Sequence, residues 1–269
     1  MNKMEEIDFC LLIPCYNNFS GLIESLKSIV YPNKKYLIVI VDDGSVEPIM
    51  IDSVKSKIRD EKPIIVLSNE TNKGITEALN KGLSWIEENV NTKYIARLDC
   101  SDTCSAERFI TQVQYLDAHP ETGLLGSWCK FEEKGTSLKY SYTTPTDHKA
   151  IIKAMHFRNV FIHPTVMFRA SLLKKIGYYP AGFHYAEDYA FFWKIILISK
   201  SFILDKILVI SEINRQGISF KKKAEQLAAR WKVVNTFSKS LPLKAAGFIK
   251  LKLLHILPKG VVLWLKSRQ

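Results

Sequence analysis

Short apolar runs alternate with longer amphipathic segments along the first 128 residues, and this alternation constrains the fold more than any other feature. The runs are rich in Ile, Val and Leu, which is typical of strands buried on both faces of a parallel sheet. We predict strands at Phe9–Ile13, Tyr36–Val41, Pro63–Leu67, Tyr94–Leu98 and Gly123–Ser127, and helices at about 19–30, 48–59, 74–89 and 105–118. The chain is therefore expected to be an α/β protein with a mostly parallel, Rossmann-like sheet flanked by helices.

The pattern changes after residue 128, where Gly, Ser and Thr turns separate shorter elements. We predict strands within Phe131–Tyr142, a short helix capped by Thr146, a strand at Thr165–Phe168, a helix from Glu187 to about Ile198, and a strand pair near Phe202–Ile213. No linker separates this part from the first. We expect one domain over residues 1–219, with halves at 1–128 and 129–219, followed by a tail at 220–269.

The net charge of +11 lies entirely in this tail, which holds twelve Lys and Arg residues and the single acid Glu225. The pattern predicts basic amphipathic helices at 221–240 and 244–257, joined near Pro242, with further apolar residues and Trp264 beyond them. Such helices are typical of a peripheral protein on an anionic membrane surface, here the inner face of the cell membrane. Packing of their apolar sides on the domain is the alternative. No segment reaches the roughly 20 apolar residues of a membrane span.

Cysteine usage favours a reducing compartment. The five cysteines include no Cys-x-x-Cys pair, which argues against a disulfide framework and a structural zinc site. The first residues are acidic, so no secretory signal is expected, and a cytoplasmic location fits best.

Polar residues follow four of the predicted strands, at the sheet edge where α/β proteins bind ligands. These groups are Pro14-Cys15-Tyr16-Asn17, Asp42-Asp43-Gly44-Ser45, Asn69 with Asn72-Lys73-Gly74, and Asp99-Cys100-Ser101-Asp102. An Asp-Gly pair after a strand also suits an ordinary turn.

Six short motifs, in order over residues 7–210, together resemble the family 2 glycosyltransferases. They are Ile13-Pro14-Cys15-Tyr16-Asn17, Val41-Asp42-Asp43-Gly44-Ser45, Asn72-x-Gly74-x-x-x-Ala78-Leu79-Asn80-x-Gly82, Arg97-Leu98-Asp99-x-x-Asp102, His163-Pro164-Thr165-Val166-Met167-Phe168-Arg169 and Glu187-Asp188-Tyr189. The resemblance implies the GT-A fold, a nucleotide-sugar donor, a divalent metal such as Mn²⁺ or Mg²⁺, and inversion at the anomeric carbon. It makes the first half nucleotide-binding and the second half the acceptor side.

The resemblance also implies roles for individual residues. Those expected at the donor are Pro14, Tyr16, Asn17, Asp43, Gly74, Asp99 and Asp102, and those expected near a metal are Asp99, Asp102 and His163. This chain departs from the family pattern at Ser101, where a metal-binding carboxylate is usual and a hydroxyl is a poorer ligand. A histidine before a proline can equally be structural.

Glu187 and Asp188 precede a strongly apolar helix segment. By the family match Asp188 is the expected catalytic base, with Glu187 in reserve; two acids at a helix start can also simply favour the helix dipole. We predict an inverting transferase that moves a sugar, most simply from a UDP-sugar, to a hydroxyl of a growing surface glycan or glycolipid such as lipopolysaccharide, O-antigen or capsule.

Two other classes of protein share part of this pattern. A sugar nucleotidyltransferase would share the strand-end acids but should carry a glycine-rich basic loop after the first strand, where this chain has Pro14-Cys15-Tyr16-Asn17. A nucleic-acid-binding protein could use the basic tail, but the first 219 residues are neutral overall and lack a basic patch with interleaved aromatic residues. The motifs define neither the donor sugar nor the linkage.

Overall fold

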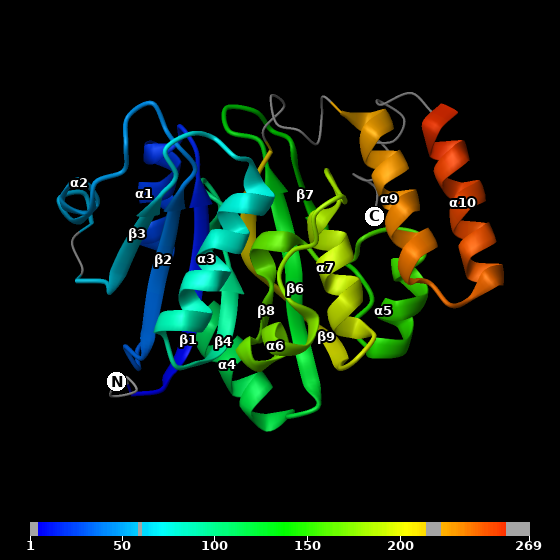
Figure 1. Cartoon of the computed structure of the whole chain (residues 1–269), viewed down its shortest axis with the longest axis horizontal. Coiled ribbons are helices and arrows are strands. Elements are labelled where there is room, and N and C mark those ends of the chain that lie inside the picture. The colour runs from blue at the N-terminus through cyan, green and yellow to red at the C-terminus, as the bar shows by residue number, and fades with distance from the viewer. Residues whose placement is uncertain (1–4, 59–60, 214–221, 257–269) are drawn as a thin grey trace.

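The computed structural model describes residues 5–58, 61–213 and 222–256, and its strands form one mixed sheet. The strands are β1 (Ile7–Cys15), β2 (Tyr36–Asp42), β3 (Ile64–Ser68), β4 (Thr92–Arg97), β5 (Thr103–Cys104), β6 (Thr122–Glu132), β7 (Lys139–Tyr142), β8 (Met167–Arg169) and β9 (Lys200–Glu212). Their order is β3-β2-β1-β4-β8-β6-β9-β5, and β7 pairs with β6 (Figure 1). The predicted α/β class is confirmed.

The helices cover both faces of this sheet. They are α1 (Phe19–Ser28), α2 (Ile51–Lys55), α3 (Ile75–Asn89), α4 (Arg108–Ala118), α5 (His148–Met155), α6 (Leu173–Ile176), α7 (Glu187–Ile196), α9 (Lys223–Phe237) and α10 (Leu241–Ile256), with 3-10 turns η1 (His163–Thr165) and η2 (Ala170–Leu172). The loops that follow β1, β2 and β4 combine exposed residues such as Tyr16 with buried ones such as Asp42 and Asp43.

Alternate residues of the central strands supply two separate cores. Leu12 and Val41 face the core that includes α3 and α7, whereas Leu11 and Ile40 face the core that includes α1 and α4. Because successive strand residues point to opposite faces, a strand buried on both sides must be apolar throughout. This explains the uniformly apolar runs of the sequence.

The sheet is parallel over β3-β2-β1-β4, and β8 then pairs antiparallel to both β4 and β6. β6 and β9 are parallel to each other. The carboxyl ends of β1, β2 and β4 therefore open onto the same edge, as the sequence pattern predicts.

The predicted strand pair near Phe202–Ile213 was wrong, because this segment is the single strand β9. In its register with β6, Ser127 pairs with Leu204 while Trp128 pairs with Ile207. Asp205 and Lys206 thus form a bulge of extra residues rather than a turn. A bulge and a short turn both use polar residues, so the sequence did not separate them.

Several predicted helix and strand boundaries also changed. The short helix α5 is capped by Asp147 and not by Thr146, since the Asp147 side chain accepts a hydrogen bond from the Ala150 N–H at 3.0 Å. The helix expected at 48–59 is only the five residues of α2, whose N-cap position, Met50, offers no side-chain acceptor. The strand expected at Thr165–Phe168 begins at Met167, after the turn η1.

The two C-terminal helices pack on the domain, side by side at the edge of the molecule (Figure 1). Val233 and Val234 of α9 are fully buried in the core that contains α7. Trp231 of α9 contacts Phe248 of α10, with ring centroids 4.7 Å apart. Helix α10 begins at Leu241, so Pro242 lies in its first turn, where its missing N–H costs no hydrogen bond.

The remainder of the predicted tail, from Leu257 through Trp264 to the end, lies outside the described residues. Among the helices that the structure does describe, none is both long and apolar enough to cross a bilayer.

Candidate active site

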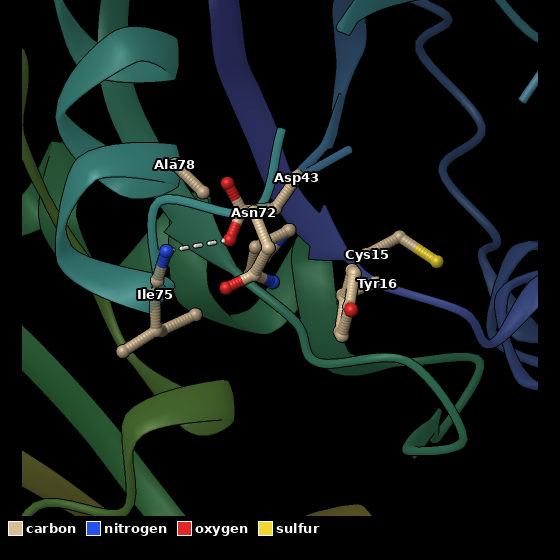
Figure 2. A pocket seen from close by; sticks show the side chains of 8 residues that line it. Cys15, Tyr16, Asp43, Asn72, Ile75 and Ala78 are labelled. Carbon is tan, nitrogen blue, oxygen red and sulfur yellow. Dashed lines mark hydrogen bonds between the residues drawn. The ribbon is translucent and has the colours of Figure 1, made fainter. Parts of the chain in front are cut away.

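A cavity of about 360 Å³ opens at the ends of β1 and β2. It is lined by Pro14, Cys15, Tyr16, Asp43, Asn72, Gly74, Ile75 and Ala78. Cys15 and Tyr16 form one side, Ile75 and Ala78 of α3 form the other, and Asp43 lies between them (Figure 2). Apolar walls around one buried carboxylate suit a flat heterocycle that donates a hydrogen bond.

Asp43 is buried and holds the loop before α3 in place. Its Oδ1 accepts hydrogen bonds from Asn69 Nδ2 at 2.8 Å and the Lys73 N–H at 3.0 Å, and its Oδ2 accepts one from the Gly74 N–H at 2.8 Å. Gly74 has a φ of 89°, a conformation that glycine adopts at little cost. The carboxylate therefore stays fixed, and about one of its four lone-pair positions remains for a ligand.

Asp42 and Asn17 organise the neighbouring loop. The carboxylate of Asp42 accepts from the Ser45 and Ile49 N–H groups, at 3.0 and 2.9 Å. Asn17 Oδ1 accepts from the Val46 N–H at 2.8 Å. Asn17 does not line the cavity, so the structure places it behind Pro14 and Tyr16 as a loop support, while those two residues reach the cavity itself.

A fully buried arginine fixes the acid at the end of β4. Arg97 donates to Asp99 Oδ1 at 2.6 Å, to His163 Nε2 at 3.2 Å and to the carbonyl of Leu12. The Asp99 side chain is 40% exposed, and its Oδ2 has no hydrogen-bond partner within the described residues. Cys100 Sγ donates to the Pro14 carbonyl at 3.4 Å, which ties this turn to the strand that forms the cavity wall.

His163 lies between Arg97 and Tyr179, whose hydroxyl is 2.8 Å from Nε2. Burial and the positive charge of Arg97 hold the pKa of His163 well below its usual range, so the imidazole is neutral. Nε2 already accepts a hydrogen bond from Arg97, so this nitrogen is not free to bind a metal. In this structure His163 supports Arg97.

Asp102 lies near Asp99 but turns toward β9. Its Oδ1 accepts from the Glu212 N–H at 3.0 Å, and burial together with the charge of Asp99 raises its pKa to about 8. Ser101 has a φ of 76°, and its Oγ accepts from Asn18 Nδ2 at 3.1 Å. The Ser101 hydroxyl therefore bonds to the N-cap residue of α1 and does not face the open site as a metal ligand would.

No three His, Cys, Asp or Glu side chains gather as a metal cage anywhere in residues 5–58, 61–213 and 222–256. The structure does not bring Asp99, Asp102 and His163 around one point. What fits a divalent cation is the free oxygen of Asp99 alone, because Mg²⁺ is commonly held by one or two carboxylates with substrate phosphates and water.

Glu187 and Asp188 begin α7. Asp188 Oδ1 accepts from the Tyr189 N–H at 2.6 Å, and Oδ2 accepts from Asn159 Nδ2 at 2.9 Å. Burial and the charge of Glu187 raise the pKa of Asp188 to about 7, and the charge of Asp99 acts in the same direction. A carboxyl group that is oriented by two donors and titrates near neutrality suits a general base.

Three residues of this site were missed by the sequence analysis. Asn159 orients Asp188, Tyr179 contacts His163, and the positive charge of Arg230 on α9 partly opposes the rise that burial causes in the pKa of Asp188. None lies in a motif or directly after a predicted parallel strand. Only the fold brings them to Asp188, so no signal in the sequence marked them.

The comparisons with known proteins agree with this geometry. Residues 10–177 match the family described as Glycosyl transferase family 2, and the chain belongs to this family. It is 30% identical over 256 residues to the amylovoran biosynthesis glycosyltransferase AmsE of Erwinia amylovora, covering 90% of this chain and 89% of that protein. The chain is therefore a glycosyltransferase.

Other similar proteins support the same fold. A UDP-Gal:alpha-D-GlcNAc-diphosphoundecaprenol beta-1,3-galactosyltransferase of Escherichia coli is 28% identical, over 69% of this chain and 66% of that one. S. aureus TarS 1-349 in complex with UDP-GlcNAc has a TM-score of 0.66 at 19% identity, covering 97% and 79% of the two chains. The mannosyltransferase PcManGT from Pyrobaculum calidifontis, in complex with GDP-Man and Mn2+, has a TM-score of 0.63 at 15% identity, covering 92% and 70%. The fold is accordingly of the GT-A type.

Proposed function

We propose that this glycosyltransferase inverts the anomeric centre of a UDP-linked sugar and passes it to a hydroxyl of a surface-glycan precursor. The observation that carries the proposal is the cavity around Asp43 at the same sheet edge as Asp99, with Asp188 close enough for the charge of Asp99 to raise its pKa. Relatives named for amylovoran biosynthesis and for a diphosphoundecaprenol acceptor support the surface-glycan part.

The donor's base would lie against Pro14 and Tyr16, with its imide N–H donating to Asp43. The diphosphate would then extend toward Asp99, whose free oxygen is the group that would hold a divalent cation. Such a cation supplies charge stabilisation for the departing diphosphate. Gly74, at the start of α3, allows the backbone to approach the nucleotide closely.

Asp188 would act as the base. It takes the proton of the acceptor hydroxyl while the oxygen forms a bond to C1 of the sugar, and the bond from C1 to the diphosphate oxygen breaks with its electron pair leaving on UDP. One base is enough, since attack opposite the leaving group needs no covalent intermediate. The hydrogen bonds from Asn159 and the Tyr189 N–H keep the carboxylate pointed in one direction.

We also propose that the protein acts at the cytoplasmic face of an anionic membrane. On α10, Leu241, Ile249 and Leu253 are 76%, 60% and 58% exposed, and Lys250 and Lys252 are exposed beside them. Apolar side chains interleaved with lysines favour the interface of an anionic bilayer. A lipid-linked acceptor would be reached from such a position.

The test is a screen of nucleotide-sugars with the purified full chain, with and without Mn²⁺. We expect hydrolysis or transfer that releases UDP, and we expect Asp43→Ala to raise the KM for the donor while Lys174→Gln, an exposed change on α6, leaves it unchanged. Release of pyrophosphate from a nucleoside triphosphate and a sugar phosphate would instead indicate a nucleotidyltransferase. Turnover of GDP-sugars in preference to UDP-sugars would contradict the donor assignment.

A further inference from the structure

Three cationic side chains lie on segments that pack against one another, namely the residues after α5, helix α9 and helix α10. Arg158 follows α5, and its guanidinium carbon lies 4.9 Å from the centre of the Tyr142 ring. Lys250 of α10 places its Nζ 5.7 Å from the centre of the Phe157 ring. We call Arg158, Arg230 and Lys250 the cationic cluster.

Chain connectivity and helix packing link this cluster to the catalytic carboxylate. Phe157, Arg158 and Asn159 are consecutive, and Asn159 Nδ2 donates to Asp188 at 2.9 Å. Helix α9, which carries Arg230, packs on α7, the helix that begins at Glu187 (Figure 1). Burial raises the pKa of Tyr142, and the positive charges of Arg158 and Arg230 both oppose this rise, so the two guanidinium groups lie near the same ring.

None of the three side chains of the cluster forms an ion pair within the described residues. Burial lowers the pKa of Lys250, and the positive charge of Arg158 adds to this effect, so these two cations lie near each other. Asp188 offsets Arg230 only in part, since its own pKa of about 7 leaves it partly protonated at neutral pH. Placing like charges close together destabilises the protein, and binding of an anionic ligand would offset that destabilisation.

The cluster is separate from the nucleotide cavity. Asp43 and α3 lie toward one end of the sheet, whereas α9 and α10 lie at the opposite edge of the molecule (Figure 1). An anion held here would therefore not be the diphosphate of the donor. Guanidinium groups match phosphate oxygens in geometry and can donate two parallel hydrogen bonds to them.

We infer that Arg158, Arg230 and Lys250 form a binding subsite for a phosphate or diphosphate group carried by the acceptor. The inference rests on the proposed function, because it names the chemistry of the acceptor for the same reaction. The anionic group would dock on the cluster while the hydroxyl to be glycosylated lies at Asp188. The apolar side chains exposed on α10 are adjacent in sequence to Lys250 and suit the hydrocarbon part of such an acceptor.

The test measures binding of farnesyl diphosphate to the full chain saturated with UDP, with farnesol as the uncharged control. We expect saturable binding of the diphosphate and none of farnesol at equal concentration. The double variant R158Q/R230Q should weaken binding by at least about tenfold, since a hydrogen bond to a charged group contributes roughly that factor. Lys174→Gln, an exposed lysine change away from the cluster, is the matched control and should leave binding unchanged.

Two results would overturn the inference. Equal affinity of native and R158Q/R230Q protein for farnesyl diphosphate would show that the cluster binds no phosphate. An equal loss of affinity for UDP alone and for farnesyl diphosphate would assign the cluster to the donor. Lys250→Gln, at an exposed side chain, repeats the test without disturbing packed groups, and circular dichroism reports folding of each variant.

The binding measurement needs no turnover, so it separates this inference from the proposed function. If the protein binds farnesyl diphosphate through the cluster but transfers no sugar from any UDP-sugar, the subsite stands and the proposed reaction fails. If it transfers sugar equally well to charged and uncharged acceptors, with R158Q/R230Q unchanged in KM for both, the reaction stands and the subsite fails.

Discussion

The raised pKa of Asp188 determines the pH range in which this residue can accept a proton. A base must be ionised, so kcat should rise as the pH increases through about 7 and level off above it. Asp188→Asn preserves shape but removes the proton acceptor, and should lower kcat by roughly 10²–10⁴-fold with little change in donor affinity. Steady-state kinetics against pH check both statements.

Glu187→Gln is the matched control for this experiment. Burial also raises the pKa of Glu187, but the directional hydrogen bond from Asn159 goes to Asp188. Near-normal turnover of Asp188→Asn together with an inactive Glu187→Gln would reverse the assignment of the base.

The raised pKa of Asp102 leads to a prediction about the stability of the fold. Its folded-state pKa of about 8 lies above the ordinary value of 3.8, so the folded protein keeps a proton that the unfolded chain has lost between those pH values. Its contribution to stability is therefore complete below about pH 4 and is lost as the pH rises toward 8. In urea unfolding, the native protein should lose stability over this range relative to Asp102→Asn. A constant difference between the two would show that the carboxyl titrates normally.

At the scale of elements, the packing of α9 makes the tail part of the fold. Val233 is fully buried against the core that contains α7, so Val233→Ala should lower the free energy of unfolding by about 1–3 kcal/mol. Asn235→Ala, at an exposed position of the same helix, should change it little. Denaturant unfolding of both variants checks this. Equal, negligible effects would mean that α9 is not docked in solution.

Local sequence patterns predicted the elements near the donor cavity well. The apolar runs predicted β1, β2, β3 and β4, and the residue groups at the ends of these strands include Asp43, Asp99 and most of the cavity wall. These features depend on neighbours in the chain: strand periodicity, turn chemistry and the edge of a parallel sheet. The same logic does not extend to β9, where a bulge and a turn share one composition.

Contacts between distant segments could not be predicted in this way. Asn159 reaches Asp188 across 29 positions, and Asp102 accepts from Glu212 across 110. Arg230 lies on a helix whose sequence was compatible both with binding to a membrane surface and with packing on the domain. The pairing of these polar groups depends on the registers of β6, β8 and β9. No local sequence pattern encodes these registers.

For the molecule as a whole, the concentration of positive charge in the C-terminal helices predicts that these helices bind an anionic membrane. The double variant I249S/L253S removes two exposed apolar side chains from α10 and should reduce sedimentation with vesicles that contain anionic lipid. V46S removes the apolar side chain of Val46, 85% exposed in the loop between β2 and α2, and is the matched control. Native binding should weaken with salt as the Debye length shrinks. Equal binding of all three proteins to neutral and anionic vesicles would exclude the membrane proposal.

The position of β9 in the sheet also has a consequence for the order of folding. Strands β1 to β4 come from the first 97 residues, so the nucleotide half can pair as soon as it leaves the ribosome, whereas Cys129 of β6 waits for Val209, eighty positions later. Such distant pairings close late and slowly. Docking of β9 is also the step that buries Asp102 under the Glu212 N–H, so it takes up a proton. We therefore expect alkaline solution to slow the last stage of refolding and to leave a half-assembled enzyme with its nucleotide cavity already formed.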